Sequence, residues 1–272
     1  MAWFKSLGLA VCVFLSACAS SIEAQPKPAP VVLMGEVHDN PDAHAQRFSL
    51  IQQWVKQGWR PAVVMEQFDR DTQTQLDEAL QLCQTAQCIY SQPWVQPWDW
   101  PLYEPLIQLA IDHNLPLLAA NVSREDANSI AKGGYTAALD PKTIKQFNLN
   151  RPMATDMQQG HQEAIELGHC NMLPASVAEN MVRAQVARDV LMAQVLINQF
   201  NQGRSVLLIA GNGHVGRVLG VPRWLPEPML EKAVVYGFVE LENNAQAEFD
   251  YAIQVKPHPR PDPCVAFKTL MK

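Results

Sequence analysis

The sequence lacks the signatures that would assign it at once to a common functional class. It has no run of basic residues and a net charge of −6, which argues against a nucleic acid as partner. No G-x-S-x-G, H-E-x-x-H or G-x-x-x-x-G-K segment occurs, so the nucleophile elbow, the zincin helix and the phosphate-binding loop are all missing. No internal repeat of solenoid period is present either.

The first thirty residues differ in composition from the rest. One charge at Lys5, an apolar stretch over residues 7–15 and small residues before Cys18 form the layout of a secretory signal too short to span a membrane. The ending LSAC resembles a bacterial lipobox. We therefore expect a signal peptide over residues 1–17, lipidation of Cys18 and a flexible tether through residue 30. A plain signal peptide cut elsewhere is the alternative. Ala19 in place of Asp resembles sorting to the outer membrane.

Cysteine is scarce, and its spacing is informative. No C-x-x-C or C-x-x-C-H occurs, which excludes covalent attachment of a c-type haem. Cys12 leaves with the signal and Cys18 takes the lipid, so four of the six cysteines remain, an even number that favours disulfides in an exported chain. The close spacing of CQTAQC predicts Cys83–Cys88 and leaves Cys170–Cys264 as the second bridge.

Apolar, β-rich runs alternate with helical patterns over residues 31–256, which we expect to form one domain. None of the runs alternates between apolar and polar residues, as expected for strands covered on both faces. Together these patterns predict an α/β fold with a mainly parallel sheet flanked by helices. The strands are expected at residues 31–35, 62–65, 115–120, 206–210 and 233–239, and the helices at 43–57, 72–84, 102–113 and 176–201.

Three features surround this alternation. VVYGFVELE followed by FDYAIQVK predicts an antiparallel hairpin at one sheet edge, before a tail over residues 257–272. Residues 133–174 show little pattern and predict an inserted, smaller helical lobe. In the helix at 176–201, the valines form an apolar stripe. Four polar side chains of that helix face away from the stripe: Arg183, Gln185, Arg188 and Asp189.

Polar side chains follow four of the predicted strands where each strand ends. Ligands of open parallel sheets bind where the carboxyl ends of the strands converge, so neighbouring strands would bring these side chains into one crevice. VVLMGEVH and VLLIAGNGH share a Gly-x-x-His ending, and glycines at 35, 211 and 213 would allow sharp turns and close approach of a ligand. A satisfied loop histidine is the alternative for either ending alone. The strand-end candidates are Glu36, His38, Asp39, Glu66, Asn121, Asn212 and His214.

The segment WVQPWDWPLYEPL gathers aromatic side chains before a predicted helix. It is either a packed loop with proline-set turns or an aromatic wall for a flat apolar ligand, with the Tyr103 hydroxyl available as a ligand. The remaining histidines carry less weight. His169 adjoins Cys170 and is either structural or functional, whereas His44 and His113 lie in helical patterns, His161 in the lobe and His258 in the tail.

Six segments of the chain together resemble the ChaN-like haem-binding uptake lipoproteins. They are LMGEVHDNPDAH, VVMEQFDRDTQ, WDWPLYEPL, GHCNMLP, AQVARD and LIAGNGHV, in the expected order. The resemblance implies a Gram-negative outer-membrane lipoprotein facing the periplasm or the cell surface and taking part in haem or iron uptake. It also implies non-covalent haem, a homodimer able to bring haems together and an outer-membrane haem receptor as partner.

The resemblance further implies an iron-ligating tyrosine, for which Tyr103 is the candidate. Trp98, Trp100, His38, His214 and His169 are the other expected haem contacts. Ala43 stands where family members often carry a histidine, so any role of that histidine is vacant in this chain.

Two other interpretations stay open. The Gly-x-x-His endings also resemble the wider TIKI/TraB-like superfamily, which includes metal-dependent peptidases. In that case Glu36, His38, Glu66 and His214 would hold a divalent metal and activate water for hydrolysis. The third interpretation is a lipid-anchored adaptor whose helical lobe contacts a transport partner. Of the three, we expect a haem-binding protein rather than an enzyme.

Overall fold

A six-stranded parallel sheet forms the centre of the fold, with strand order β3-β2-β4-β1-β5-β6. The computed structural model describes residues 28–240 and 247–265, so the expected signal peptide, Cys18 and most of the tether lie outside the described residues. The strands are β1 (Val31–Glu36), β2 (Ala62–Asp69), β3 (Leu117–Asn121), β4 (Val206–Gly211), β5 (Ala233–Val239) and β6 (Tyr251–Gln254). The prediction of an α/β fold with a mainly parallel sheet is confirmed.

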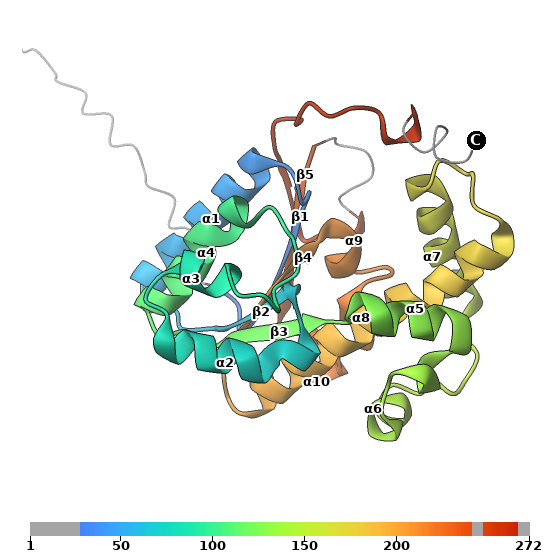
Figure 1. Cartoon of the computed structure of the whole chain (residues 1–272), viewed down its shortest axis with the longest axis horizontal. Coiled ribbons are helices and arrows are strands. Elements are labelled where there is room, and N and C mark those ends of the chain that lie inside the picture. The colour runs from blue at the N-terminus through green and yellow to red at the C-terminus, as the bar shows by residue number, and fades with distance from the viewer. Residues whose placement is uncertain (1–27, 241–246, 266–272) are drawn as a thin grey trace, which may run out of the picture.

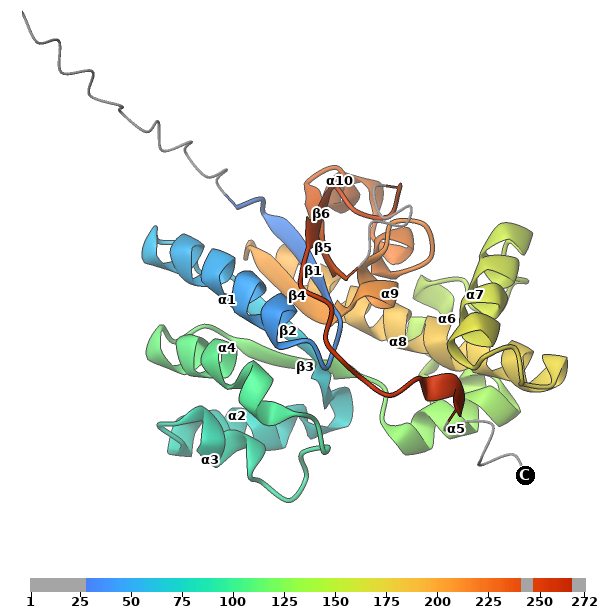
Figure 2. The same ribbon diagram turned by 90° about the horizontal axis from the view of Figure 1, so that it is seen from above.

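Helices cover both faces of the sheet, as Figures 1 and 2 show. Successive residues of β1 point to opposite faces, so Val32 packs with α1 and α4 whereas Leu33 packs with α8. Both faces are therefore dry, which explains the continuous apolar runs in the sequence. The helices are α1 (Pro41–Lys56), α2 (Gln73–Leu82), α3 (Ala86–Tyr90), α4 (Trp100–Asp112), α5 (Arg124–Gly133), α6 (Pro141–Gln146), α7 (Thr155–Gly168), α8 (Ala175–Asn201), α9 (Asn212–Val215) and α10 (Glu227–Leu230), with short 3₁₀ turns η1 (Arg70–Thr72), η2 (Tyr135–Ala137) and η3 (Val221–Trp224).

The expected antiparallel hairpin at the sheet edge is wrong, because β6 pairs with β5 in parallel. The chain returns to the start of β5 before β6 begins, and the backbone N–H of Asp250 donates to the carbonyl of Val235 at 2.9 Å. Phe249 packs directly over Gly237, where a Cβ would lie 2.4 Å from the phenyl ring. This return segment converts an apparent hairpin into a crossover.

The stretch predicted as a helical lobe contains η2, α6 and α7, beside α5 and α8 (Figure 1). After β6, residues 255–264 run from the sheet edge to the lobe, where Cys264 joins Cys170. On the way, Lys256 and Arg260 bond to residues that follow β1, including Asn40 and Asp39. The C-terminal segment therefore passes the carboxyl end of β1.

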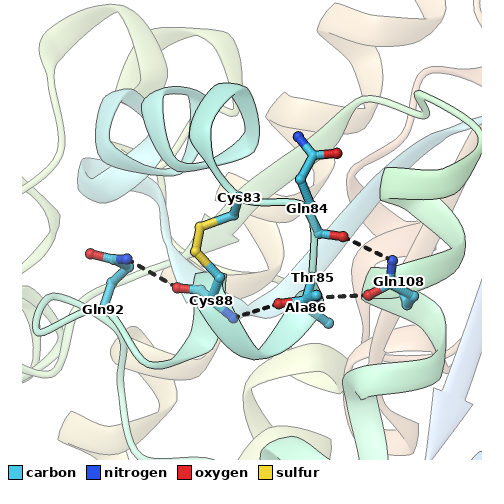
Figure 3. Close-up of a disulfide and its surroundings, with 7 residues drawn as sticks. All are labelled: Cys83, Gln84, Thr85, Ala86, Cys88, Gln92 and Gln108. Atoms are coloured by element: carbon cyan, nitrogen blue, oxygen red, sulfur yellow. Dashed lines mark hydrogen bonds between the residues drawn. A yellow bond between two sulfur atoms is a disulfide. The ribbon is translucent and has the colours of Figure 1, made fainter.

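Both predicted disulfides are present in the structure. Cys83–Cys88 closes the turn between α2 and α3, where Thr85 caps α3 (Figure 3). Gln108 of α4 holds the same turn, because its side chain accepts from Ala86 N at 2.9 Å and donates to the carbonyl of Gln84 at 3.3 Å. The disulfide thus stabilises a turn that is also hydrogen-bonded to the neighbouring helix. Among the described residues, no helix is both long and apolar enough to cross a membrane.

Candidate functional site

The strand order brings the polar strand ends together, as the sequence predicts. β4 lies between β1 and β2, and Glu36 at the end of β1 is in register with Gly211 at the end of β4. The backbone N–H of Gly211 donates to Glu66 Oε2 on β2 at 2.8 Å. His38 and His214 follow β1 and β4, so both histidines and both glutamates share one edge of the sheet.

Glu36 is the centre of a buried hydrogen-bond network. Its carboxylate accepts from the Tyr103 hydroxyl at 2.5 Å, His38 Nδ1 at 2.9 Å and Gln67 Nε2 at 3.3 Å. The guanidinium of Arg47, on α1, pairs with the other oxygen. Burial lowers the pKa of Arg47 to about 10, so it stays charged at neutral pH and neutralises Glu36. Since Glu36 and Arg47 are 2% and 1% exposed, this is a buried ion pair.

His44 lies behind this network on α1 and supports it. Its Nδ1 accepts from Arg47 at 3.0 Å, and its Nε2 donates to the carbonyl oxygen of His38 at 3.0 Å. Burial lowers the pKa of His44, which keeps the ring neutral and consistent with this pattern of one donor and one acceptor. His44 thereby holds the loop that carries His38.

Glu66 and His214 form a second buried ion pair at the same edge. His214 Nε2 lies 3.4 Å from Glu66, and its Nδ1 donates to Asp189 of α8 at 2.5 Å. Burial favours neutral groups, yet Glu66 and Asp189 raise the pKa of His214 to about 10, and His214 in turn lowers the pKa of Glu66 to about 2. Burial raises the pKa of Asp189 to about 6. The imidazolium therefore lies between two acidic side chains.

Close approach at this edge explains two of the three strand-end glycines. A Cβ on Gly211 would lie 2.8 Å from His38 Nε2, and a Cβ on Gly35 would lie 2.3 Å from Asn212 Oδ1. Side chains at these positions would displace His38 or the turn that carries His214. Gly213 has open space around it, so nothing in the structure requires glycine there.

His38 is the accessible member of the site. Its side chain is 42% exposed, whereas those of Glu36 and His214 are 0% and 9% exposed. Its ring packs edge-on against Trp98, with the centroids 5.0 Å apart. Nδ1 bonds to Glu36, and Nε2, which carries the lone pair when the ring is neutral with its proton on Nδ1, makes no hydrogen bond among the described residues.

The structure does not support the alternative interpretation, a divalent-metal site. No group of three or more His, Cys, Asp or Glu side chains in the described part of the chain is placed to hold a metal ion. The physical reason is that each glutamate already faces a cation: Arg47 occupies Glu36 and the His214 imidazolium occupies Glu66. A divalent cation would have to displace both.

The predicted aromatic wall is mostly buried and offers little surface to a ligand. Tyr103 is 0% exposed and donates its hydroxyl to Glu36, and burial raises its pKa above the ordinary value for tyrosine. Trp100 is 6% exposed and donates its indole N–H to Gln96, whereas Trp98 is half-buried beside His38. The packed-loop interpretation therefore describes Tyr103 and Trp100, whereas Trp98, like Trp94, is only half-buried.

Other expected residues have structural partners. Asn121 accepts from Arg188, Asn212 donates to the Phe238 carbonyl at 2.8 Å, and Asp39 pairs with Arg260 at 2.9 Å. His169 ends α7 and bonds to the carbonyl of Ile165 at 2.7 Å, with Cys170 beside it in a disulfide. These side chains position loops and helix ends.

Sequence reasoning missed three partners of the site, namely Arg47, Gln67 and Asp189. The prediction that Asp189 faces away from the apolar stripe of α8 is wrong: Asp189 follows Val182 by two helical turns, so it lies on the buried face, is 0% exposed and bonds to His214. Arg47 is 1% exposed on α1, on the face that also buries Ile51. A charged residue in register with buried apolar neighbours is the signal that would have revealed Arg47.

A family model and one solved structure agree with this fold. A family described as haem-binding uptake, Tiki superfamily, ChaN matches residues 23–225. The solved structure of cofacial haem binding to ChaN of Campylobacter jejuni has a TM-score of 0.67 at 22% identity, covering 84% of this chain and 88% of that one. An erythromycin esterase EreC mutant in its open conformation has a TM-score of 0.44 at 14% identity, covering 77% and 70%. Among curated proteins, none matches.

Proposed function

Since the chain belongs to the ChaN haem-binding uptake family of the Tiki superfamily, we propose that it binds haem non-covalently at the carboxyl-end edge of its sheet. Membership of this family supports haem as the ligand. The observation that supports this location of the haem site is the exposed imidazole of His38, whose Nδ1 is fixed by a buried carboxylate. Iron-ligating histidines characteristically donate their second ring nitrogen to such a partner.

The residues present fit a haem iron better than a divalent metal. An imidazole can ligate haem iron, and the porphyrin would need apolar surface beside it rather than further carboxylates. Trp98 supplies such a surface next to His38. When bound, haem would supply an iron centre for redox or ligand chemistry; the chain's own residues position the imidazole and keep it in one tautomer.

Tyr103 has a supporting place in this proposal. Iron ligation by Tyr103 would require haem to reach a side chain with 0% exposure and to break its hydrogen bond to Glu36. In this structure the hydroxyl instead orients the carboxylate that orients His38. We propose that His38 would hold the haem iron and that Tyr103 would position Glu36 and thereby His38.

The test of haem binding is an optical titration of haemin into the purified protein, with free haemin as reference. We expect a saturable Soret shift at stoichiometric haem and at least a tenfold weaker Kd for His38→Ala. His113→Ala is the matched control, because His113 ends α4 just before β3 begins, at the amino ends of the strands and away from His38. A titration that never saturates would overturn haem binding by the isolated chain. A saturable titration that His38→Ala leaves unchanged would overturn only the location of the haem site at His38.

We further propose that the protein acts in haem or iron uptake as an outer-membrane lipoprotein anchored through Cys18. The lipobox-like LSAC supports this anchor. Metabolic labelling with palmitate and fractionation of membranes test it: label and outer-membrane recovery are expected for the natural chain and not for Cys18→Ala. Equal labelling of the two would overturn the anchor.

Sedimentation before and after haemin addition tests whether haem brings two copies together.

A further inference from the structure

A second candidate site lies in the lobe, apart from the strand ends. Residues between η2 and α7, together with α8 and η3, surround a cavity of about 400 Å³. Its lining is largely apolar, and none of the strand-end residues takes part in it. The volume is in the range of pockets that enclose small organic ligands. The apolar and aromatic lining residues include Tyr135, Phe147, Leu149, Met153, Met157 and Trp224.

Two buried hydrogen-bond donors on residues that line this cavity have no partner among the described residues. They are Nε of Arg183 and Nε1 of Trp224. The other side of the Arg183 guanidinium is anchored, since its Nη2 donates to the carbonyl of Ala131 at 2.7 Å and to Asn180. Leaving a buried donor unsatisfied costs about 1–3 kcal/mol, so native proteins rarely leave two beside one cavity. Both atoms are covered in this structure, so an acceptor in the cavity would reach them only when the lining side chains move aside.

The charges around the cavity favour an anionic acceptor. Arg151 and Arg183 line it against a single carboxylate, that of Glu179. Burial raises the pKa of Tyr135 to about 12, with Arg183 opposing the rise, so the tyrosine adds a neutral hydroxyl rather than a negative charge. A carboxylate offers two oxygens and matches N–H donors with charge-assisted hydrogen bonds.

We propose that the lobe cavity binds an apolar molecule that ends in a carboxylate. The carboxylate accepts from Arg183 Nε and Trp224 Nε1, and the apolar part lies among Phe147, Met153 and Met157. This site is separate from the proposed haem site at the strand ends and does not depend on it. The same chemistry has two sources, a fatty-acid-like monocarboxylate or the propionate side of haem, and the experiment separates them.

The test uses isothermal titration of the purified full chain carrying Cys18→Ser, which cannot be acylated at that position and needs no detergent. The probes are dodecanoate below its micelle concentration and dodecanol, which has the same chain without the charge. We expect saturable 1:1 binding of dodecanoate and at least tenfold weaker binding of dodecanol. Equal affinities, or no saturable dodecanoate binding, would overturn the proposal.

Two conservative variants test the donors. Trp224→Phe keeps the aromatic ring and removes the N–H, and Arg183→Lys keeps the charge and removes Nε. Each is expected to weaken dodecanoate five- to tenfold and to leave dodecanol within twofold. Trp59→Phe is the matched control, because Trp59 Nε1 is also buried without a partner but packs on Trp54, away from the lobe. If Arg183→Lys fails to fold, Trp224→Phe alone decides; an unchanged dodecanoate Kd in it would overturn the role of the donors.

Haemin identifies the source of the carboxylate. If haemin displaces dodecanoate and Trp224→Phe weakens haemin by a similar factor, the cavity takes the propionate side of haem. If dodecanoate binds equally well to haem-loaded protein, the cavity takes a separate monocarboxylate. Either result supports the cavity site, and neither depends on the outcome for His38→Ala, so failure of the haem site at the strand ends and failure of the cavity are distinguishable.

Discussion

The strand-end site and the lobe cavity show two opposite ways of placing polar groups in a protein interior. At the strand ends, each buried glutamate faces a cation of the same chain: Arg47 for Glu36 and His214 for Glu66. Beside the lobe cavity, Arg183 and Trp224 each carry a buried donor with no acceptor among the described residues. In the first arrangement each glutamate has a partner within the chain, whereas in the second two donors lack an acceptor. The comparison teaches that titratable residues paired with one another need no ligand to satisfy them, whereas an unmatched donor beside a cavity leaves a hydrogen bond still to be made.

The same comparison limits what the strand ends can bind. Because their charges are already paired, only a ligand that needs one neutral donor and an apolar neighbour fits them, and His38 with Trp98 provides this. The lobe cavity, with two arginines against one glutamate, fits the carboxylate of a molecule whose other end is apolar. Four predictions sharpen or break this contrast, and they follow from the largest expected effect to the smallest.

Glu36→Gln is expected to destabilise the fold by about 3–5 kcal/mol, because it leaves the buried Arg47 guanidinium without a carboxylate. Urea unfolding measures this loss. The double variant Glu36→Gln with Arg47→Met removes both charges and should recover most of the stability.

An exposed ion pair provides the control for that loss. Arg223 and Asp156 are 42% and 77% exposed with 4.0 Å between them, so Arg223→Gln should change stability by about 1 kcal/mol or less. If Glu36→Gln costs no more than Arg223→Gln, the strand-end network is not the paired cluster described above.

Replacing Cys170 and Cys264 together by Ser should cost about 2–4 kcal/mol, the typical range for a disulfide that closes a long loop. This bridge joins residues separated by 94 positions and ties the C-terminal segment to the lobe. Cys83 and Cys88 are separated by only 5, so their replacement should cost less. Urea unfolding of both variants checks the order. A larger loss for the short bridge would mean that the turn held by Gln108 matters more than loop closure.

Stability should fall at alkaline pH through His214. Its pKa is raised in the fold from 6.5 to about 10, so its contribution is fully present below pH 6.5 and is lost as the pH rises through about 10. The loss should be about 1.5–3 kcal/mol, as for hydrogen bonds to charged groups. Glu66 and Asp189 titrate below this window.

The variant His214→Gln isolates this contribution. Its free energy of unfolding should change less than that of the natural protein between pH 6.5 and 10. His113→Gln, at the end of α4, should follow the natural profile. Parallel profiles for His214→Gln and the natural protein would show that the imidazolium does not hold the two acidic side chains together.

The sequence alone predicted most of the sheet because buried parallel strands leave continuous apolar runs, as at β1 and β4. It could not predict the direction of β6. Periodicity marks a strand but not its orientation, and the reversal depends on Phe249 packing over Gly237 and on the return to the start of β5. The expectation of a hairpin followed the commonest short connection, and tertiary packing overrode it.

At the site, the strand ends were predictable and their partners were not. Glu36 and His214 follow recognisable strands, so their meeting follows from the topology of a parallel sheet. Arg47 and Asp189 come from α1 and α8, and their pairing depends on how those helices rotate over the sheet. The two unmatched donors of the lobe cavity have no sequence signature, since a missing partner is a property of packing alone.

Tyr103→Phe makes the smallest predicted change and decides between two roles of the same hydroxyl. The variant removes one hydrogen bond to Glu36, which three other groups still contact, so stability should fall by about 0.5–1.5 kcal/mol. If Tyr103 only positions Glu36 and thereby His38, the Kd for haemin should weaken less than threefold and the Soret position should stay. If the Soret band shifts and affinity falls as far as in His38→Ala, the tyrosine reaches the iron after a rearrangement that exposes it. In that case the strand-end site is as open to ligand as the lobe cavity, and the contrast between the two regions fails.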